Sequence, residues 1–207
     1  MQLNPGRSAR AQWRKLSAPI ERLIELGLLD PSQSVFDYGC GQGLDVQYLR
    51  ERGFEIEGWD PYWCADGELV EADVVILNFV VDCIGDPVER AEALVRAWGL
   101  SRDYLMVTAR RDRALVRICP YSDGWLTRWG TFQRLFTQRE FYQFLSETLP
   151  GTSPLEFDRG GCAIIPKTED WQERISNRLQ PPGRWRSGLR PPRGSVSELT
   201  RRHQAER

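Results

Sequence analysis

Three glycines at alternate positions, Gly39, Gly41 and Gly43, have the type and spacing that most directly suggest chemistry in this sequence. They follow the short apolar stretch Val35-Phe-Asp-Tyr, and an acidic residue, Asp60, ends a second such stretch. Glycine lets a backbone turn tightly and approach a ligand without a Cβ in the way. A carboxylate at the end of the second strand can accept hydrogen bonds from the hydroxyls of an adenosine ribose. These residues therefore predict a site for a nucleoside-bearing cofactor.

The spacing of the loop distinguishes between two such cofactors. A dinucleotide fingerprint reads G-x-G-x-x-G, and its loop and following helix hold a pyrophosphate. Here the third glycine comes one place early, and an acid, Asp37, stands two residues before the first glycine. S-adenosylmethionine has no phosphate but has an ammonium group, which Asp37 can bind directly or through water. We therefore expect S-adenosylmethionine, with Tyr38 and Pro61 beside the glycines and Asp60; a nicotinamide cofactor is the alternative that this spacing disfavours.

Polar residues at the ends of predicted strands are the candidates for catalysis, because ligands of open α/β sheets bind beyond the carboxyl ends of the strands. Four such residues qualify: Asn78, Asp82, Tyr121 and Asp123. Asn78 is also expected near the methyl group of the cofactor. Other roles stay open, since Asp82 can cap the next helix and Tyr121 and Asp123 can belong to an ordinary turn. The sole histidine, His203, lies near the C-terminus, so we expect no histidine base in the folded body.

The cysteine pattern predicts neither disulfides nor a metal site. The five cysteines are odd in number, widely scattered and without a C-x-x-C pair. This usage is typical of reduced thiols in a cytoplasmic protein. No apolar run reaches the roughly 18 residues of a membrane span, and the N-terminus lacks the apolar core of a secretory signal. We expect a cytoplasmic protein with no metal and no membrane contact.

Strands and helices alternate around these residues in the predicted structure. We expect helices beginning near Ala18, Leu44, Pro87 and Gln138, and strands over residues 35–38, 55–59, 72–81 and 103–109. Two further apolar stretches flank Gly160-Gly161 and predict an antiparallel hairpin. The fold class is therefore α/β: a Rossmann-like class I methyltransferase sheet, mostly parallel, with a C-terminal antiparallel hairpin and helices on both faces.

The helix after Asp86 is expected to pack through one apolar face. The apolar residues of this face recur at helical spacing: Val88, Ala91, Leu94, Val95 and Trp98.

The third strand of this fold is predicted to be vestigial. Only eleven residues separate Asp60 from the next apolar run, at Ala72. A full crossover needs roughly a dozen or more residues. An acidic contact to the adenine amino group that this region normally supplies is then limited locally to Asp66 or Glu68.

Length and composition predict one domain and a tail. We expect residues 1–30 to form an N-terminal helical segment, 31–170 the cofactor-binding domain, and 171–207 a basic, largely disordered tail. From Trp171 onward nine arginines face three glutamates, and Pro-Pro-Gly and Pro-Pro-Arg-Gly interrupt any regular element. Two interpretations of the tail stay open: a solubilising terminus, and non-specific contact with nucleic-acid phosphates.

Several segments besides the glycine loop resemble the DNA phosphorothioation-associated methyltransferase family. The matching segments are 15–19, 27–29, 35–43, 58–61, 86–94, 97–98, 121–124, 126–128 and 130–133. The resemblance implies an S-adenosylmethionine-dependent enzyme of bacterial type, linked by genomic association to DNA sulfur modification. It does not imply a substrate. The sequence departs from the family pattern at Leu44, Asp82 and Arg134. From the length of 207 residues we expect no room for the further region that many relatives carry.

The nature of the methyl acceptor is constrained by a motif that is missing. Methyltransferases of DNA base amino groups resemble one another in a (D/N)-P-P-(Y/F) loop that holds a flipped base, and here the run is Asn78-Phe-Val-Val. We expect a small-molecule, RNA or protein acceptor rather than a base of duplex DNA. The alternative function is a catalytically weak cofactor-binding scaffold or nucleic-acid-binding partner in a DNA-modification or defence system.

Overall fold

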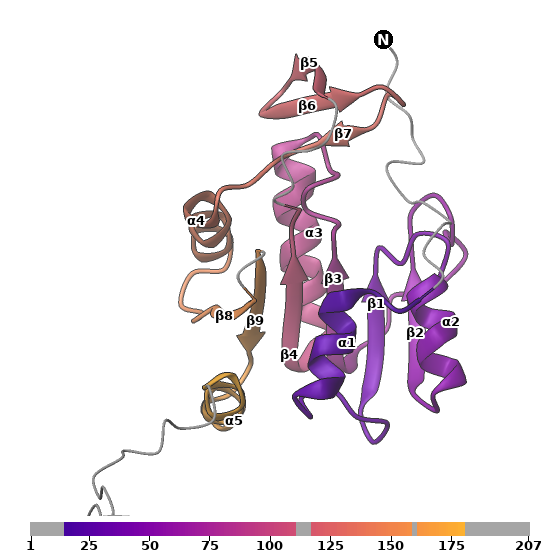
Figure 1. Cartoon of the computed structure of the whole chain (residues 1–207), viewed down its shortest axis with the longest axis vertical. Helices are drawn as coiled ribbons and strands as arrows, with labels where there is room; N and C mark the ends of the chain where they lie inside the picture. The colour runs from indigo at the N-terminus through magenta and orange to yellow at the C-terminus, as the bar shows by residue number, and fades with distance from the viewer. Residues whose placement is uncertain (1–14, 111–116, 159–160, 181–207) are drawn as a thin grey trace, which may run out of the picture.

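A six-stranded β-sheet forms the centre of the computed structural model, which describes residues 15–110, 117–158 and 161–180 (Figure 1). Its strands are β1 (Ser34–Tyr38), β2 (Glu55–Trp59), β3 (Ala72–Asn78), β4 (Ser101–Thr108), β8 (Leu155–Asp158) and β9 (Cys162–Pro166). They lie in the order β2-β1-β3-β4-β9-β8. The first four are parallel, whereas β9 is antiparallel to β4 and β8. The predicted α/β sheet with a C-terminal hairpin is confirmed.

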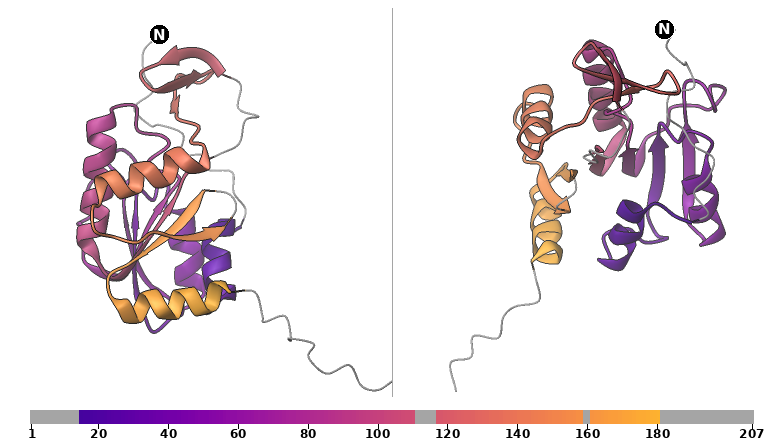
Figure 2. Two further views of the ribbon diagram at one scale, coloured as in Figure 1. Left: turned by 90° about the vertical axis from the view of Figure 1, so that its left-hand side faces the viewer. Right: turned by 45° about the horizontal axis from the view of Figure 1, so that its top comes forward.

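Helices cover both faces of this sheet, as Figure 2 shows. One face carries α1 (Ala18–Glu25), α2 (Leu44–Glu51) and α5 (Glu169–Leu179), and the other carries α3 (Pro87–Leu100) and α4 (Gln138–Thr148). Each face has its own hydrophobic core. β3 lies between the two cores, and its residues 74–77 are completely buried, as expected for a continuous apolar run in a parallel sheet.

Local signals place several helix starts as predicted. The side chain of Asp86 accepts a hydrogen bond from the backbone N–H of Val88 and caps α3. Thr137 and Glu140 form a reciprocal capping box at the start of α4. Gly43 precedes α2 in a left-handed conformation, with φ of 74°. Such bonds are made within a few residues, so the sequence alone is enough to predict them.

The predicted apolar face of α3 is confirmed at Leu94, which is completely buried, and at Trp98, which packs against the core, but it is wrong at Val88 and Val95. Val88 is 65% exposed and Val95 is 48% exposed, whereas Ala93, Ala97 and the arginine Arg90 are buried. The helix is rotated so that the Arg90 side chain is buried and its guanidinium is hydrogen-bonded. A periodicity that counts only apolar residues misses this orientation, because it assigns a charged side chain to the solvent face.

The vestigial third strand is confirmed. Between β2 and β3, in a stretch that the structure describes completely, the only strand-like pairing is an isolated bridge between Asp60 and Cys64. β2 is therefore the edge of the sheet. The strand after this stretch is also shorter than predicted: β3 ends at Asn78, because Phe79 has a positive φ of 57°.

A second, three-stranded antiparallel sheet was not predicted. It consists of β5 (Arg117–Tyr121), β6 (Gly124–Thr127) and β7 (Phe132–Gln133), in that order. It lies beyond the carboxyl ends of β3 and β4, next to the N-terminal end of α3 (Figure 1). We call it the cap sheet. The Tyr121–Gly124 segment is the turn between its first two strands, one of the two interpretations of that segment.

The folded part extends past the predicted domain boundary at residue 170. Residues of the expected tail form most of α5, whose Ile175 is completely buried and whose Trp171 and Leu179 pack against the core. The remainder of the expected tail, 181–207, lies outside the described residues. No described helix has the length and apolarity to cross a membrane.

Candidate functional site

A cavity of about 480 Å³ opens at the carboxyl ends of β1 and β3. From β1 the chain passes to β2 on one side and returns to β3 on the other, so the strand order reverses here. Ligands of open α/β sheets bind at such a switch point. The volume lies in the range of about 300–1,000 Å³ that is usual for small-molecule sites.

The structure divides the predicted site residues into two groups. Six of them line the cavity: Tyr38, Gly39, Gly41, Asp60, Pro61 and Asn78. Five do not: Asp37, Gly43, Asp82, Tyr121 and Asp123. The cofactor motifs therefore meet at one place, and most of the residues predicted for catalysis lie elsewhere.

The glycine loop is shaped by contacts that exclude a side chain at Gly39. Its φ is 85°, and a Cβ at this position would lie 2.5 Å from a methyl carbon of Val80. The backbone N–H groups of Gly39 and Cys40 both donate to the carbonyl of Trp59, at 2.7 and 3.1 Å. The loop is thus tied to the end of β2, and at Gly39 it packs too closely against the segment after β3 for a side chain.

Asp60 is oriented by the backbone around it. One carboxylate oxygen accepts from the N–H groups of Tyr62 and Trp63, each at 2.9 Å. The other oxygen accepts from the N–H of Gly41 at 3.2 Å. A carboxylate can accept about four hydrogen bonds, so one position on the second oxygen is left for a ligand at the cavity.

Three carboxylates gather around the loop: Asp37, Asp45 and Asp60, which we call the acid cluster. Asp37 is only 3% exposed. Burial raises the pKa of Asp37 well above its usual value, and repulsion from Asp45 and Asp60 adds to this shift. Among the described residues no lysine or arginine forms an ion pair with the cluster. Asp37 thus lies beneath the loop, while Asp45 and Asp60 reach the cavity.

Asn78 is held in a hydrogen-bond network that joins distant parts of the chain. Its amide nitrogen donates to Ser17 Oγ at 2.9 Å and to Asp45 Oδ2 at 3.4 Å. Its oxygen accepts from Thr108 Oγ1 at 2.7 Å, and the N–H of Ser17 donates to Asp45. Both donor hydrogens of Asn78 are therefore in use, and the network fixes the segment before α1 against the cavity.

Asp82 is completely buried beside the cap sheet. Its Oδ2 accepts from Gln133 Nε2 at 2.5 Å, and its carbonyl accepts from the N–H of Arg134 at 2.8 Å. Burial raises the pKa of Asp82. These bonds attach the end of β3 to β7. In the structure Asp82 therefore connects the segment after β3 to the cap sheet, and its carboxylate does not line the cavity.

Asp123 and Tyr121 belong to the cap sheet. Asp123 receives two hydrogen bonds from the buried Arg90, at 2.7 and 2.8 Å, and forms a second ion pair with Arg134. Arg90 also donates to the carbonyl of Ile84. The hydrogen bond from Arg90 holds the pKa of Asp123 below its usual range. Tyr121 is 40% exposed, with its ring against Phe132.

Several cavity residues carry charge or aromatic surface that the sequence analysis did not single out. These are Lys15 and Asp45 near α1, Glu89, Glu92 and Arg96 on α3, and Phe79 and Arg110 after β3 and β4. Asp66 and Glu68, the two local candidates for an adenine contact, do not line the cavity. The signal available for Phe79 and Arg110 was their position directly after strands. No group of acidic, histidine or cysteine side chains in the described ranges could hold a metal ion.

Comparisons with known proteins agree with this architecture. The sequence profile of a family described as methyltransferase domain matches residues 8–147. The sugar N-methyltransferase KedS8 from Streptoalloteichus sp ATCC 53650 has 14% identity and a TM-score of 0.53, over 77% of this chain and 91% of that chain. The CcbJ methyltransferase from Streptomyces caelestis has 12% identity and a TM-score of 0.50, over 75% and 93%. No curated protein is similar enough in sequence to match.

Proposed function

The chain belongs to the methyltransferase-domain family and uses S-adenosylmethionine as its methyl donor, and on this premise we propose that it methylates a small molecule held in the cavity. The observation that carries the proposal is the cavity itself, which has a small-molecule volume and is lined by both cofactor motifs. The matched solved structures support the fold alone, at 12–14% identity.

The residues at the cavity fit this cofactor. Gly39 and Gly41 bring the backbone of the glycine loop to the cavity wall, and Asp60 keeps an acceptor position for a ribose hydroxyl. S-adenosylmethionine supplies an electrophilic methyl group on a sulfonium. The chain therefore needs chiefly to orient the acceptor in line with the donor and to exclude water.

The amino acid part of the cofactor is matched by charges on the α1 side of the cavity. Lys15 and Asp45 both line it, and the N–H of Ser17 bonds to Asp45 at 2.9 Å, which keeps the two segments together. A lysine can bind the carboxylate and an aspartate the ammonium group. We assign Asp45 this role beside the deeper Asp37.

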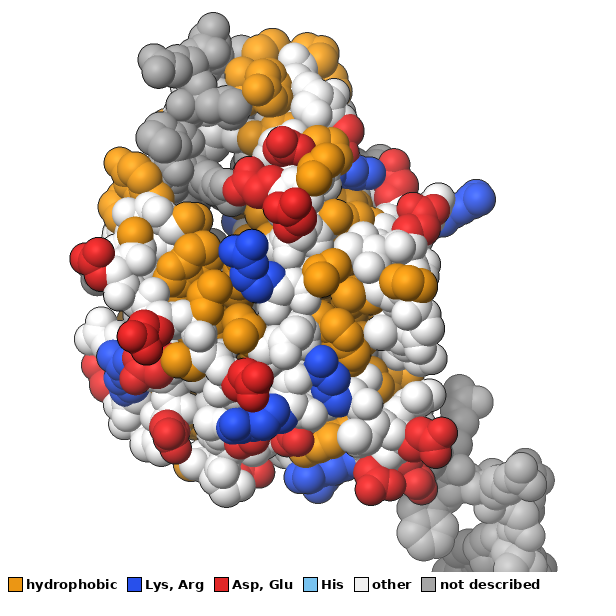
Figure 3. Space-filling model, turned by 180° about the vertical axis from the view of Figure 1, so that it is seen from behind, with side chains coloured by type: hydrophobic (Ala, Val, Ile, Leu, Met, Phe, Trp, Pro, Cys, Tyr) orange, Lys and Arg blue, Asp and Glu red, His pale blue; other side chains and the backbone are white. Residues whose placement is uncertain are grey.

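The adenine is assigned to the opposite side of the cavity, against α3. No residue from Trp63 to Leu77 lines the cavity, although the structure describes this whole stretch. The α3 side chains Glu89, Glu92 and Arg96 do so instead. Figure 3 shows this face of the molecule, with hydrophobic and acidic side chains exposed on it. Glu92 and the small Ala93 both line the cavity, and we propose that Glu92 accepts a hydrogen bond from the adenine amino group.

The main test combines binding with product analysis. Calorimetric titration should show binding of S-adenosylhomocysteine and none of NAD. Incubation with a labelled methyl donor and fractionated bacterial extract should then place label in the small-molecule fraction. Label confined to RNA, DNA or protein would contradict the proposed acceptor class, and absence of S-adenosylhomocysteine binding would contradict the cofactor site.

The adenine assignment has a test of its own. S-inosylhomocysteine carries a carbonyl where adenine carries its amino group, so its position 6 accepts a hydrogen bond and cannot donate one to Glu92. We expect the wild-type protein to prefer S-adenosylhomocysteine by roughly tenfold or more, because hydrogen bonds to charged groups contribute about 1.5–3 kcal/mol. Glu92→Gln should remove most of this preference, and the control Glu68→Gln should keep it. A preference unchanged in Glu92→Gln would refute the assignment.

A link to DNA phosphorothioation is supported only by the segment resemblance in the sequence. Deletion of the gene in a strain that carries the modification, followed by measurement of phosphorothioate content, would test it. The alternative of a cofactor-binding scaffold predicts salt-sensitive DNA binding without methyl transfer to any fraction.

A further inference from the structure

Phe79 has an unusual backbone conformation at the edge of the cavity. It is one of two non-glycine residues with positive φ in the described part of the chain, at 57°. Its N–H donates to Thr108 Oγ1 at 2.8 Å, and its carbonyl accepts from Cys83 Sγ at 3.2 Å. Such backbone strain costs about 1–3 kcal/mol and is concentrated at functional sites. The strain is retained here at a residue whose side chain lines the cavity.

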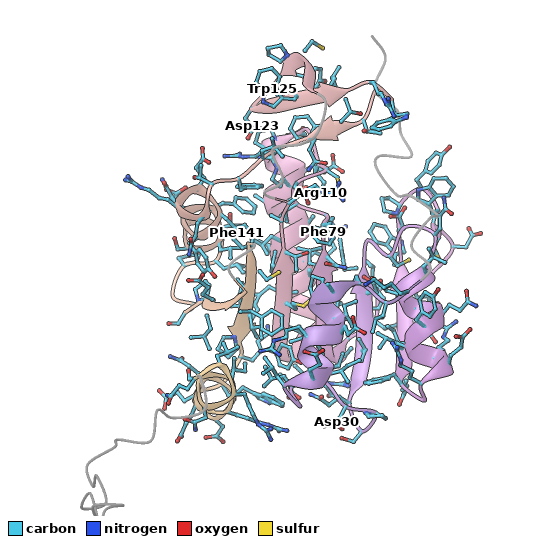
Figure 4. The ribbon with its side chains drawn as sticks, viewed as in Figure 1. Asp30, Phe79, Arg110, Asp123, Trp125 and Phe141 are labelled. Atoms are coloured by element: carbon cyan, nitrogen blue, oxygen red, sulfur yellow. The ribbon has the colours of Figure 1, made fainter. Side chains whose placement is uncertain are left out.

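Arg110 lies next to this ring. Its guanidinium carbon is 5.6 Å from the centre of the Phe79 ring, and Figure 4 shows the two residues together above the ends of β3 and β4. Both line the cavity, together with the apolar Val80 and Ile84. Within the described ranges no carboxylate forms an ion pair with Arg110. The buried Asp82, which is bonded to Gln133, lies near enough that the charge of Arg110 opposes the rise of the Asp82 pKa caused by burial. The side chain thus presents a guanidinium to the cavity.

Arg110 is not among the charged residues that we assign to the cofactor. Lys15 and Asp45 lie on the α1 side and match the cofactor's carboxylate and ammonium groups. Arg110 instead follows β4, the strand beyond β3, where ligands of such sheets extend past the switch point. A planar guanidinium stacks on aromatic faces and binds carboxylate or phosphate through paired hydrogen bonds.

We infer that Phe79 and Arg110 form the acceptor subsite and that the methyl acceptor is a small aromatic molecule bearing a carboxylate or phosphate. The inference rests on the proposed function and names its substrate class. A flat ring packs on Phe79, and the anionic group pairs with Arg110. A polyanion such as RNA fits less well, because four acids, Asp45, Asp60, Glu89 and Glu92, line the same cavity.

The test uses defined probes with protein saturated with S-adenosylhomocysteine. Fluorine NMR would follow millimolar para-fluorobenzoate and para-fluorophenyl phosphate, with para-fluorobenzamide as a neutral compound of the same shape. We expect the wild-type protein to bind at least one anionic probe more tightly than the amide. Arg110→Gln should lower the affinity for that probe by about tenfold, the scale of a charge-assisted hydrogen bond. Arg110→Lys should lower this affinity less. Phe79→Leu should lower the affinity for all three probes.

Matched measurements make the outcome decisive. Arg96→Gln, an arginine on α3 at the same cavity, should leave probe binding within twofold, and Arg110→Gln should leave S-adenosylhomocysteine binding within threefold. The inference is overturned if no anionic probe binds or if Arg110→Gln leaves probe binding unchanged. It is also overturned if Arg110→Gln weakens the binding of S-adenosylhomocysteine as strongly as the binding of the probe. Binding of an RNA oligonucleotide that depends on Arg110 would overturn the small-molecule class. Failure of the wild-type protein to bind S-adenosylhomocysteine would refute the proposed function instead.

Discussion

Two clusters of three charged residues differ in how their charges are balanced. At the cap sheet, Asp123 lies between Arg90 and Arg134, with the Arg90 side chain only 1% exposed. At the cavity, the acid cluster of Asp37, Asp45 and Asp60 brings like charges together, and burial and repulsion raise the pKa of Asp37. Asp123 thus has two arginine partners, whereas no lysine or arginine among the described residues forms an ion pair with the acid cluster.

The difference indicates what each cluster does. Opposite charges with paired hydrogen bonds hold the cap sheet on α3, and removing one partner would leave a buried charge uncompensated. Like charges destabilise the empty protein but attract a cationic ligand such as S-adenosylmethionine. Asp123 was predicted to be catalytic because of its position after a strand; its geometry is that of an anchor.

The largest effect is expected for Asp123→Ala. Loss of this carboxylate leaves Arg90 buried without its acid, which costs about 3 kcal/mol or more. For a protein of this size that corresponds to a decrease in Tm of roughly 6–12 °C. Thermal unfolding would measure it, with Glu57→Gln as a control. Glu57 forms an exposed pair with Arg50, and its loss should cost less than about 1 kcal/mol. Equal losses in both variants would remove the distinction between buried and surface pairs.

The next effect is on binding. Asp60→Asn should weaken the binding of S-adenosylhomocysteine by about 10- to 100-fold. The reason is that the ribose hydroxyl loses a hydrogen bond to a charged acceptor, which contributes about 1.5–3 kcal/mol. Titration calorimetry would measure this change. Asp66→Asn, an exposed acid outside the cavity, is the control and should bind normally. Normal binding by the Asp60 variant would contradict a ribose site at this carboxylate.

The smallest effect distinguishes the clusters by pH. Asp37 has a raised pKa in the folded state, so the folded protein retains a proton that the unfolded chain releases near pH 4. The penalty for ionising Asp37 is absent below that pH, grows as the pH rises, and is complete above the raised pKa. Asp37→Asn should therefore stabilise the protein by about 1–3 kcal/mol at neutral pH.

Denaturant unfolding across pH would check this prediction. The gain in free energy of unfolding from Asp37→Asn should shrink on acidification and vanish near pH 4. Asp123 should show the opposite sign, because its lowered pKa makes its contribution fall only as the pH drops below the usual aspartate range. A variant at Asp37 that loses stability at neutral pH would show that the buried carboxylate supports the fold.

Much of the cofactor side could be predicted because its signals are local. The alternate glycines, the acid after β2 and the missing third strand are visible as short patterns, and the cavity brings Gly39, Gly41 and Asp60 together. The acceptor side could not be predicted in this way. Phe79 was expected to continue a strand, and only its positive φ turns the chain so that the ring lines the cavity.

By itself the sequence determined the alternation of strands and helices, the glycine loop and the acid that follows β2. These features depend on backbone conformation and hydrogen bonds between near neighbours. Only the tertiary structure decided which charges are paired, since Asp123 meets Arg90 across 33 positions and Asn78 meets Ser17 across 61. Electrostatic partners depend on distance in space and on burial, and neither quantity can be read from the spacing of residues along the chain.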